Sequence, residues 1–149
     1  MKYYIASDHA GVELKKFIVK LFENKNIEII DLGPTEAIRV DYPDFAAKVC
    51  EAVIADDFVN FGILICGSGL GMSMSANKFP GIRAALCHNE YSAKMAREHN
   101  DANIICLGER VSGLGMVENI LEAWLNSSFE GGRHGARVEK INCLGCCRA

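Results

Sequence analysis

The chain has 149 residues, of which 50% are hydrophobic and 23% are charged, and its formal net charge is -3. This size fits a single domain covering residues 1–149, with enough apolar side chains for one core. The weakly acidic charge argues against a nucleic-acid-binding surface. The N-terminus reaches a charge too early for a secretory leader, and no later apolar run approaches the roughly 18 residues of a membrane span. We therefore expect a cytoplasmic protein that binds neither nucleic acids nor membranes.

Short apolar segments typical of strands alternate with segments of helical periodicity along the whole chain. The five expected strands cover residues 2–6, 27–31, 61–65, 82–87 and 103–107. Helices are expected after the turn at 7–11, from 41 to about 54 with a proline in the first turn, over 70–78, over 91–98 and along 117–124. A break at Gly131-Gly132 precedes a short C-terminal segment.

This alternation predicts a parallel sheet, because right-handed crossovers place the connecting helices on both of its faces. The expected fold class is α/β: a three-layer α/β/α sandwich around a doubly wound, five-stranded, Rossmann-like parallel sheet, with a C-terminal helical arm. In such sheets ligands bind where strands end and helices begin. The functional loops should therefore cluster at the carboxyl ends of the strands.

Seven cysteines are present, and their odd number in a chain without an export signal favours reduced thiols. Cys50, Cys87 and Cys106 lie in apolar stretches, where cysteine usually acts as a small buried hydrophobe. The tail Cys143-Leu-Gly-Cys146-Cys147 has a spacing found in zinc ligands, but no second Cys or His pair nearby completes a tetrahedral set. No metal site is predicted, and the tail is assigned no function.

Cys66 differs from the other cysteines because it follows the apolar segment 61–65 and opens the glycine-rich turn Gly67-Ser-Gly-Leu-Gly71. Glycine costs about 1 kcal/mol relative to alanine in a helix, so three glycines indicate that something approaches this backbone closely. A tight packing turn is the alternative, although one glycine would satisfy it. Free amides at a helix start bind anions. We expect an anion or oxyanion cradle with a potential base at its mouth.

Familiar motifs do not fit this turn. A dinucleotide-binding fingerprint would need a glycine at Met72, and the Gly-Lys-Ser/Thr of a Walker loop is absent. Phosphatases that attack through cysteine carry an arginine six residues later, where this chain again has Met72. Ser68 and Gly69 exclude a redox Cys-x-x-Cys at Cys66.

Polar residues after the first strand and after the helix 91–98 are further candidates. Asp8 and His9 end the first strand, so they should lie at the same edge as Cys66, although Asp8 could instead cap the next helix. His99 and Asn100 close a helix, a place that also suits a histidine with a purely structural role.

Three arginines suit a phosphate group. Arg133 and Arg137 are four residues apart and would share one helix face, with a solvated basic patch as the alternative. Arg110 follows the fifth strand and would add a positive charge at the functional edge. Together with His9 they favour a phosphorylated metabolite as the ligand.

These motifs together resemble the ribose-5-phosphate isomerase B family, which includes isomerases of six-carbon sugar phosphates. The likeness covers nearly the whole chain. It is carried by Ser7-Asp-His-Ala-Gly11, Asp41-Tyr-Pro43, Ile65-Cys-Gly-Ser-Gly-Leu-Gly71, Ala76-Asn-Lys78, Arg97-Glu-His-Asn-Asp101 and Glu130-Gly-Gly-Arg-His134 through Arg137. The resemblance implies an aldose-ketose isomerase of the pentose phosphate pathway that interconverts D-ribose 5-phosphate and D-ribulose 5-phosphate without a metal or organic cofactor. It also implies a homodimer with the site shared between subunits, or a tetramer built from such dimers.

By the same resemblance, Cys66 removes the proton from C2, His99 helps to open the furanose ring, and the glycine loop holds the enediolate. Ser68 and Asp8 join them as catalytic residues; the Ser68 hydroxyl could relay a proton between the substrate oxygens, or it could merely cap the next helix. The matched substrate-binding residues, some of them supplied by the neighbouring subunit, are Asp8, His9, Tyr42, Gly67, Ser68, Gly69, Leu70, Gly71, Asn100, Arg110, Arg133 and Arg137.

The choice of base separates two branches of this family. Some relatives use a carboxylate at the position of Met72, which methionine cannot replace, so the chain falls in the branch with the cysteine. A thiol with a pKa near 8.5 becomes a useful base only where a helix start or nearby cations favour the thiolate. Two alternatives stay open: an isomerase that prefers a hexose 6-phosphate such as allose or galactose 6-phosphate, and a sugar-phosphate-binding module without turnover.

Overall fold

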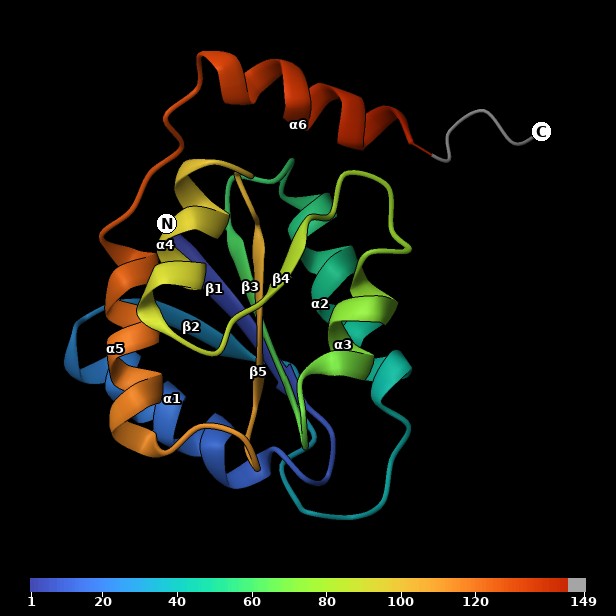
Figure 1. Cartoon of the computed structure of the whole chain (residues 1–149). Helices are drawn as coiled ribbons and strands as arrows, with labels where there is room; N and C mark the ends of the chain where they lie inside the picture. The colour runs from blue at the N-terminus through green and yellow to red at the C-terminus, as the bar shows by residue number, and fades with distance from the viewer. Residues whose placement is uncertain (145–149) are drawn as a thin grey trace.

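The computed structural model describes residues 1–144, and within them strands and helices alternate along the chain (Figure 1). The strands are β1 (Lys2–Ser7), β2 (Glu28–Asp31), β3 (Phe61–Cys66), β4 (Ala84–Leu86) and β5 (Ile104–Gly108). The helices are α1 (Val12–Asn24), α2 (Tyr42–Ala55), α3 (Leu70–Ala76), α4 (Glu90–Glu98), α5 (Leu114–Leu125) and α6 (Arg133–Cys143). None of these helices is both long enough and apolar enough to cross a membrane.

The five strands form one parallel sheet in the order β2-β1-β3-β5-β4. The central strand, β3, is buried at every position, which explains its uninterrupted apolar pattern. Its register with β5 sets Gly62 opposite Ile104 and Cys66 opposite Gly108. The predicted five-stranded, doubly wound α/β fold is confirmed.

Helices cover both faces of this sheet (Figure 1). Phe22 of α1, Ala93 of α4 and Trp124 of α5 belong to one core cluster, on one face. Val49 of α2 and Met72 of α3 belong to a second cluster, on the other face. Each face of the sheet thus has its own apolar cover, as a three-layer sandwich requires.

Strand β4 is shorter than predicted. It begins at Ala84 rather than at residue 82, and it ends at Leu86. The amide of Ile82 donates a hydrogen bond to the carbonyl oxygen of Phe79, so Ile82 belongs to the turn before the strand. Its apolar side chain extends the strand pattern in sequence because it packs into the core from that turn.

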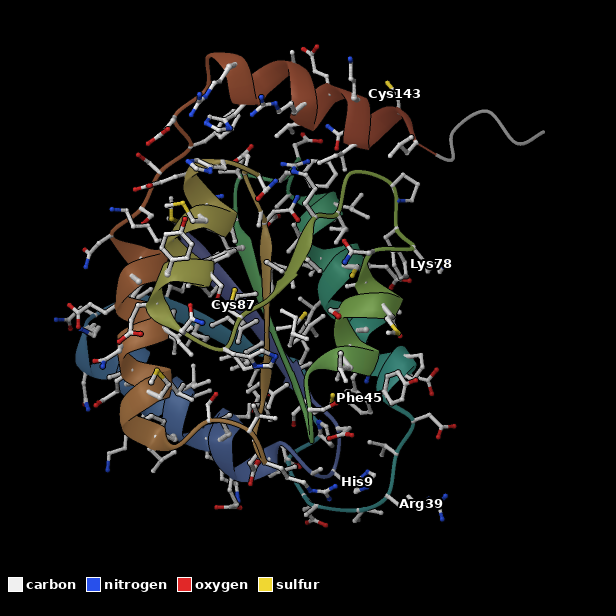
Figure 2. The ribbon with its side chains drawn as sticks, viewed as in Figure 1. His9, Arg39, Phe45, Lys78, Cys87 and Cys143 are labelled. Atoms are coloured by element: carbon white, nitrogen blue, oxygen red, sulfur yellow. The ribbon has the colours of Figure 1, made fainter. Side chains whose placement is uncertain are left out.

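The C-terminal arm is helix α6, which lies across the end of the sheet where the strands begin (Figure 1). Figure 2 shows Cys143 of this helix and His9, which follows β1, at opposite ends of the molecule. Arg83 secures the helix by donating from Nη1 to Oδ1 of Asn142 at 3.0 Å, and Val138 of the same helix is 7% exposed. Cys146 and Cys147 lie outside the described residues.

An ion pair between a buried lysine and a partly exposed aspartate braces the opposite end of the sheet. Lys15 of α1 is only 1% exposed, and its ammonium group lies 2.6 Å from Oδ1 of Asp31 at the end of β2. The same oxygen accepts the amide of Gly33 at 2.8 Å, and the carbonyl oxygen of Gly33 accepts the amide of Ser7 at 3.1 Å. The pair therefore connects α1 and β2 to the residue before Asp8.

Candidate active site

A cavity of about 440 Å³ opens at the carboxyl ends of β1, β3 and β5. Most of its lining residues were predicted as site residues from the sequence. The lining residues are Asp8, His9, Ala10, Tyr42, Cys66, Gly67, Ser68, Gly71, Arg110 and Val111. Two predicted residues of the glycine loop are not among them: Gly69 is buried, and Leu70 is 50% exposed.

Cys66 lies at the end of β3 with its sulfur held by the loop that follows. The amide of Gly69 donates a hydrogen bond to Sγ of Cys66 at 3.1 Å. An N–H group binds an anionic acceptor more strongly than a neutral one, so this contact suits a sulfur that gains charge. The amides of Glu109 and Arg110 donate to the carbonyl oxygens of Cys66 and Gly67, both at 3.0 Å, and thereby fix the start of the loop to the end of β5.

At two positions of the loop, 69 and 71, the backbone conformation or the neighbouring side chains favour glycine. Gly69 has a φ of 80°, in the left-handed region that favours glycine. A Cβ atom there would come within 2.5 Å of Leu86. At Gly71 a Cβ atom would lie 2.6 Å from the ring of Tyr42, which forms part of the cavity wall. The packing alternative left open by the sequence accounts for these two glycines without any ligand.

Three other cysteines are buried in the core away from the cavity. Burial raises the pKa of Cys50 to about 12 and that of Cys87 to about 11, and it raises the pKa of Cys106 well above its ordinary value. These three side chains stay protonated at neutral pH, and none of them lines the cavity. Their predicted role as buried hydrophobes is confirmed.

Asp8 and His9 form the turn that follows β1. Asp8 is 7% exposed, and its Oδ1 accepts the amide of Ala10 at 2.9 Å, so it stabilises the turn. It does not cap the next helix, because the N-cap of α1 is Gly11. Its own amide donates to the carbonyl oxygen of Ile65, next to Cys66. Nδ1 of His9 accepts the amide of Val40 at 3.5 Å, which links the imidazole to the segment before α2.

The remaining predicted residues lie at the opposite edge of the sheet. His99 and Asn100 follow α4 and precede β5, whose first residue pairs with Gly62 of β3. Cys66 is four residues further along β3, and at about 3.3 Å per residue the two edges are roughly 13 Å apart. Within one copy of the chain, His99 therefore does not reach Cys66.

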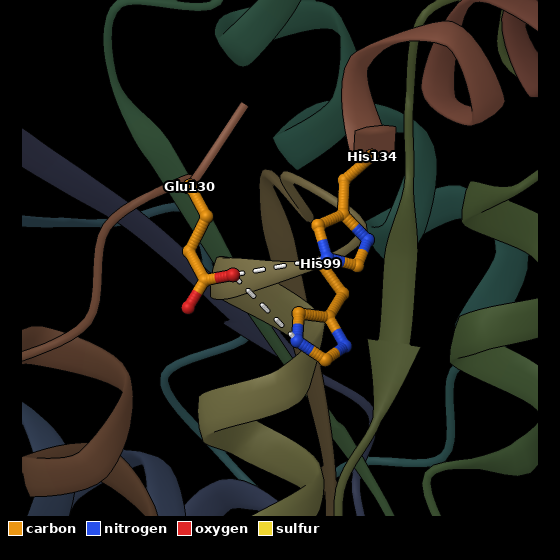
Figure 3. A group of neighbouring side chains, drawn as sticks. All are labelled: His99, Glu130 and His134. Carbon is orange, nitrogen blue, oxygen red and sulfur yellow. Dashed lines mark ion pairs between the residues drawn. The ribbon is translucent and has the colours of Figure 1, made fainter. Parts of the chain in front are cut away.

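Helix α6 adds charged side chains to this amino edge. Arg133 and Arg137 are exposed, whereas His134 between them is 6% exposed. The rings of His134 and His99 are stacked, with centroids 4.1 Å apart and planes inclined by 9°. Figure 3 shows Glu130 beside both rings, with Oε2 lying 3.9 Å from Nε2 of His99 and 3.7 Å from Nε2 of His134.

Neither Glu130 nor His134 was assigned a role from the sequence, although both lie in a segment that carries the resemblance. Their spacing of four residues was the only local signal. Burial lowers the pKa of His134, and charge repulsion from the neighbouring His99, Arg133 and Arg137 lowers it further, while Glu130 opposes them. The imidazole of His134 is therefore neutral at pH 7, and its Nε2 accepts a hydrogen bond from Nε of Arg133 at 3.4 Å.

One buried arginine, Arg97, and one partly buried arginine, Arg83, hold the segment that carries His99. Arg83 donates to the carbonyl oxygens of Asn100, from Nε at 3.0 Å, and of Asp101, from Nη2 at 2.7 Å. Nη1 of Arg97 donates to Oδ1 of Asp101 at 3.1 Å and to the carbonyl oxygen of Ala102 at 2.6 Å. The turn between α4 and β5 is thus fixed on both sides.

Known proteins share this sequence pattern and this fold. The family model described as Ribose/Galactose Isomerase matches residues 3–141. The chain belongs to this family. The ribose-5-phosphate isomerase B of Escherichia coli (strain K12) is 46% identical to this chain over 143 residues, which cover 96% of this chain and 95% of the relative.

Two solved structures share the arrangement of the whole domain. Ribose-5-phosphate isomerase B of Clostridium thermocellum is 53% identical and superposes with a TM-score of 0.92 over 95% of each chain. The enzyme from Mycoplasma genitalium, whose crystal structure contains bound ribulose-5-phosphate, is 42% identical with a TM-score of 0.91, over 95% of this chain and 93% of that one. The resemblance inferred from the motifs is confirmed at the level of the family.

Proposed function

We propose that the protein is an aldose-ketose isomerase that interconverts D-ribose 5-phosphate and D-ribulose 5-phosphate, with Cys66 as the base and with no cofactor. The observation that carries this proposal is the sulfur of Cys66, hydrogen-bonded to the amide of Gly69, in the wall of a cavity of about 440 Å³. Such a volume suits a small phosphorylated sugar. The E. coli relative is named for this activity, and the M. genitalium structure contains its ketose product.

The reaction moves one proton from C2 to C1 and a second from the hydroxyl group on C2 to the carbonyl oxygen on C1. As a thiolate, Cys66 takes the proton from C2 of the open-chain aldose and returns it to C1 of the enediolate. Negative charge develops on the substrate oxygens, and donors fixed at the loop stabilise it without reorganising. Oγ of Ser68 already accepts the amide of Leu70 at 3.3 Å, so its hydroxyl hydrogen is directed elsewhere and can be donated to a substrate oxygen.

A phosphate group is anionic, so its binding requires positively charged side chains at the same cavity. Nη1 of Arg110 lies 3.3 Å from where a Cβ atom of Gly67 would stand, so the guanidinium group lies over the loop. His9 lines the same cavity. A guanidinium group binds phosphate through paired hydrogen bonds, and Arg110 is exposed enough to turn toward it.

In this proposal the ring-opening residue comes from a second copy of the chain. His99, Asn100, Arg133 and Arg137 lie at the amino edge, whereas Cys66 lies at the carboxyl edge. A two-fold symmetric homodimer can place the amino edge of one subunit against the carboxyl edge of the other, and symmetry then completes two equal sites. Leu70 and Met74, 50% and 65% exposed on α3 beside the loop, are apolar side chains that such an interface would cover. A tetramer of two such dimers would keep the same sites.

Mixing two inactive variants tests the shared site. Cys66→Ala and His99→Asn are each expected to abolish turnover as pure proteins. After subunit exchange, about half of the dimers contain one of each, and every mixed dimer has one intact site out of two, so about a quarter of the normal activity should return. The control mixes Cys66→Ala with Asp8→Asn, which damage the same edge, and should recover nothing. Mixed dimers without activity would contradict the proposal.

A comparison of substrates tests the sugar specificity. The ratio of kcat/KM for ribose 5-phosphate to that for allose 6-phosphate and galactose 6-phosphate measures the preference directly. We expect the pentose to be favoured, whereas a preference for a six-carbon sugar would overturn the assigned substrate and leave the base unaffected. Exchange of the C2 hydrogen with solvent distinguishes an isomerase from a module that only binds the sugar.

A further inference from the structure

We propose that His99, Glu130 and His134 form a binding site for a divalent transition-metal ion such as Zn²⁺, and that the bound ion inhibits isomerisation. The binding half of this proposal rests on the three side chains alone. The inhibitory half rests on the proposed function of His99. The ion would thus be a reversible inhibitor and not a cofactor of the reaction.

The three side chains present the donor atoms that zinc prefers. One nitrogen from each imidazole and one oxygen from the carboxylate lie within 4.8 Å of one another (Figure 3). Two histidines and one glutamate form a familiar zinc ligand set that leaves the fourth position for water. Within residues 1–144 this is the one group of at least three His, Cys, Asp or Glu side chains with such spacing.

The distances are close to those of an occupied site. With metal–ligand bonds of about 2.0–2.1 Å, neighbouring ligand atoms of a tetrahedral ion are roughly 3.3 Å apart. Oε2 of Glu130 lies 3.7 Å from Nε2 of His134 and 3.9 Å from Nε2 of His99. These two pairs must therefore each approach by about half an ångström to hold the ion, and the two imidazole nitrogens, within 4.8 Å of each other, must also close to that spacing.

Backbone contacts fix the relative positions of two of the ligands. The amide of Glu130 donates to the carbonyl oxygen of Glu98 at 3.0 Å, which anchors Glu130 beside the end of α4, where His99 lies. The amide of His134 donates to the carbonyl oxygen of Gly131 at 3.0 Å in the first turn of α6. Binding would thus order little backbone, which favours affinity.

Two local movements accompany binding. A metal ion lies near the plane of each imidazole that binds it, so the stacked ring of His99, with its side chain 36% exposed, must rotate. Arg133 must release Nε2 of His134, a contact whose length of 3.4 Å marks it as weak. The positive charges of Arg133 and Arg137 oppose a cation, and we therefore expect binding that a chelator reverses.

An occupied site would stop ring opening. A histidine that transfers protons needs the lone pair of its imidazole, and coordination to a metal ion removes that lone pair. The ion would also hold His99 against α6 and away from the substrate. Inhibition should then follow the occupancy of the three-residue site.

The binding test uses the full chain with Cys143, Cys146 and Cys147 replaced by serine, because a Cys-x-x-Cys tail could bind zinc by itself. Calorimetric titration with Zn²⁺ should show one ion per chain. Glu130→Gln should weaken this binding at least about tenfold. Glu118→Gln, at an exposed position of α5, is the matched control and should leave the affinity unchanged. A background chain without zinc binding, or equal affinities in the two variants, would overturn the site.

The activity test uses the same three proteins. Zn²⁺ should inhibit the background chain and Glu118→Gln, a chelator should restore their turnover, and Glu130→Gln should need at least about tenfold more zinc for the same inhibition. Zinc binding without inhibition would overturn the inhibitory half alone. A protein with no isomerase activity before zinc is added would refute the proposed function, while the calorimetric result would still decide the site.

Discussion

At the carboxyl edge of the sheet, Cys66 and Asp8 are almost buried and their partners are backbone groups, whereas at the amino edge Asn100, Arg133 and Arg137 are exposed. The carboxyl edge thus has its geometry fixed within one chain. The side chains of Asn100, Arg133 and Arg137 are exposed, where a second molecule can meet them, while His99 is partly buried against His134. The comparison teaches that the proposed base, Cys66, is held by backbone groups of its own chain, while the two arginines proposed to bind phosphate, Arg133 and Arg137, lie on the surface.

The largest effect is expected from Cys66→Ala, which removes the base from the carboxyl edge. A general base contributes about 10²–10⁴ to a rate, so kcat should fall at least about a hundredfold. Exchange of the C2 hydrogen of ribose 5-phosphate with solvent, followed by NMR, measures this step. Binding of the substrate should remain, since the phosphate contacts are intact. Near-normal exchange would show that another group is the base.

A smaller effect, on stability, is expected from Asp31→Ala. The substitution leaves the buried ammonium group of Lys15 without its partner, and breaking such a pair typically costs about 3 kcal/mol. Glu13→Ala is the matched control, because it removes the exposed partner of Lys16, 2.8 Å away, and should cost less than about 0.5 kcal/mol. The free energy of unfolding in denaturant measures both. Equal losses would show that the ion pair does not brace the carboxyl edge.

The smallest effect is expected from Arg137→Ala at the amino edge. Loss of a charged hydrogen bond to phosphate should raise KM about tenfold or more and leave kcat nearly unchanged. The unfolding free energy should not change, because Arg137 is exposed. Lys140→Ala, one turn further and also exposed, is the control and should alter neither constant. An unchanged KM in Arg137→Ala would remove this arginine from the substrate contacts.

Much of the fold and one edge of the site could be predicted from local patterns. Apolar runs such as 61–65 and the periodicity of Val117, Ile120 and Trp124 are set by neighbouring residues, and both sheet and helix keep these patterns. The order of the strands in the sheet could not be predicted from local patterns. Placing β5 between β3 and β4 depends on which edges pair in space, and no local pattern records that. The start of β4 was missed because Ile82 packs into the core from a turn.

The sequence by itself identified Cys66 and the glycine loop as candidate site residues at the carboxyl edge. They are consecutive in the chain, so their residue types and order alone indicate the chemistry. Only the tertiary structure decided which of the other candidate residues lie at the carboxyl edge of the sheet and which lie at the amino edge. The place of His99 between α4 and β5 implies the amino edge, but its stacking on His134 depends on α6 folding back across the ends of the strands. Thirty-five positions separate the two rings in sequence. A contact of that range is set by the packing of whole elements, which is why the cluster with Glu130 emerged only from the folded chain.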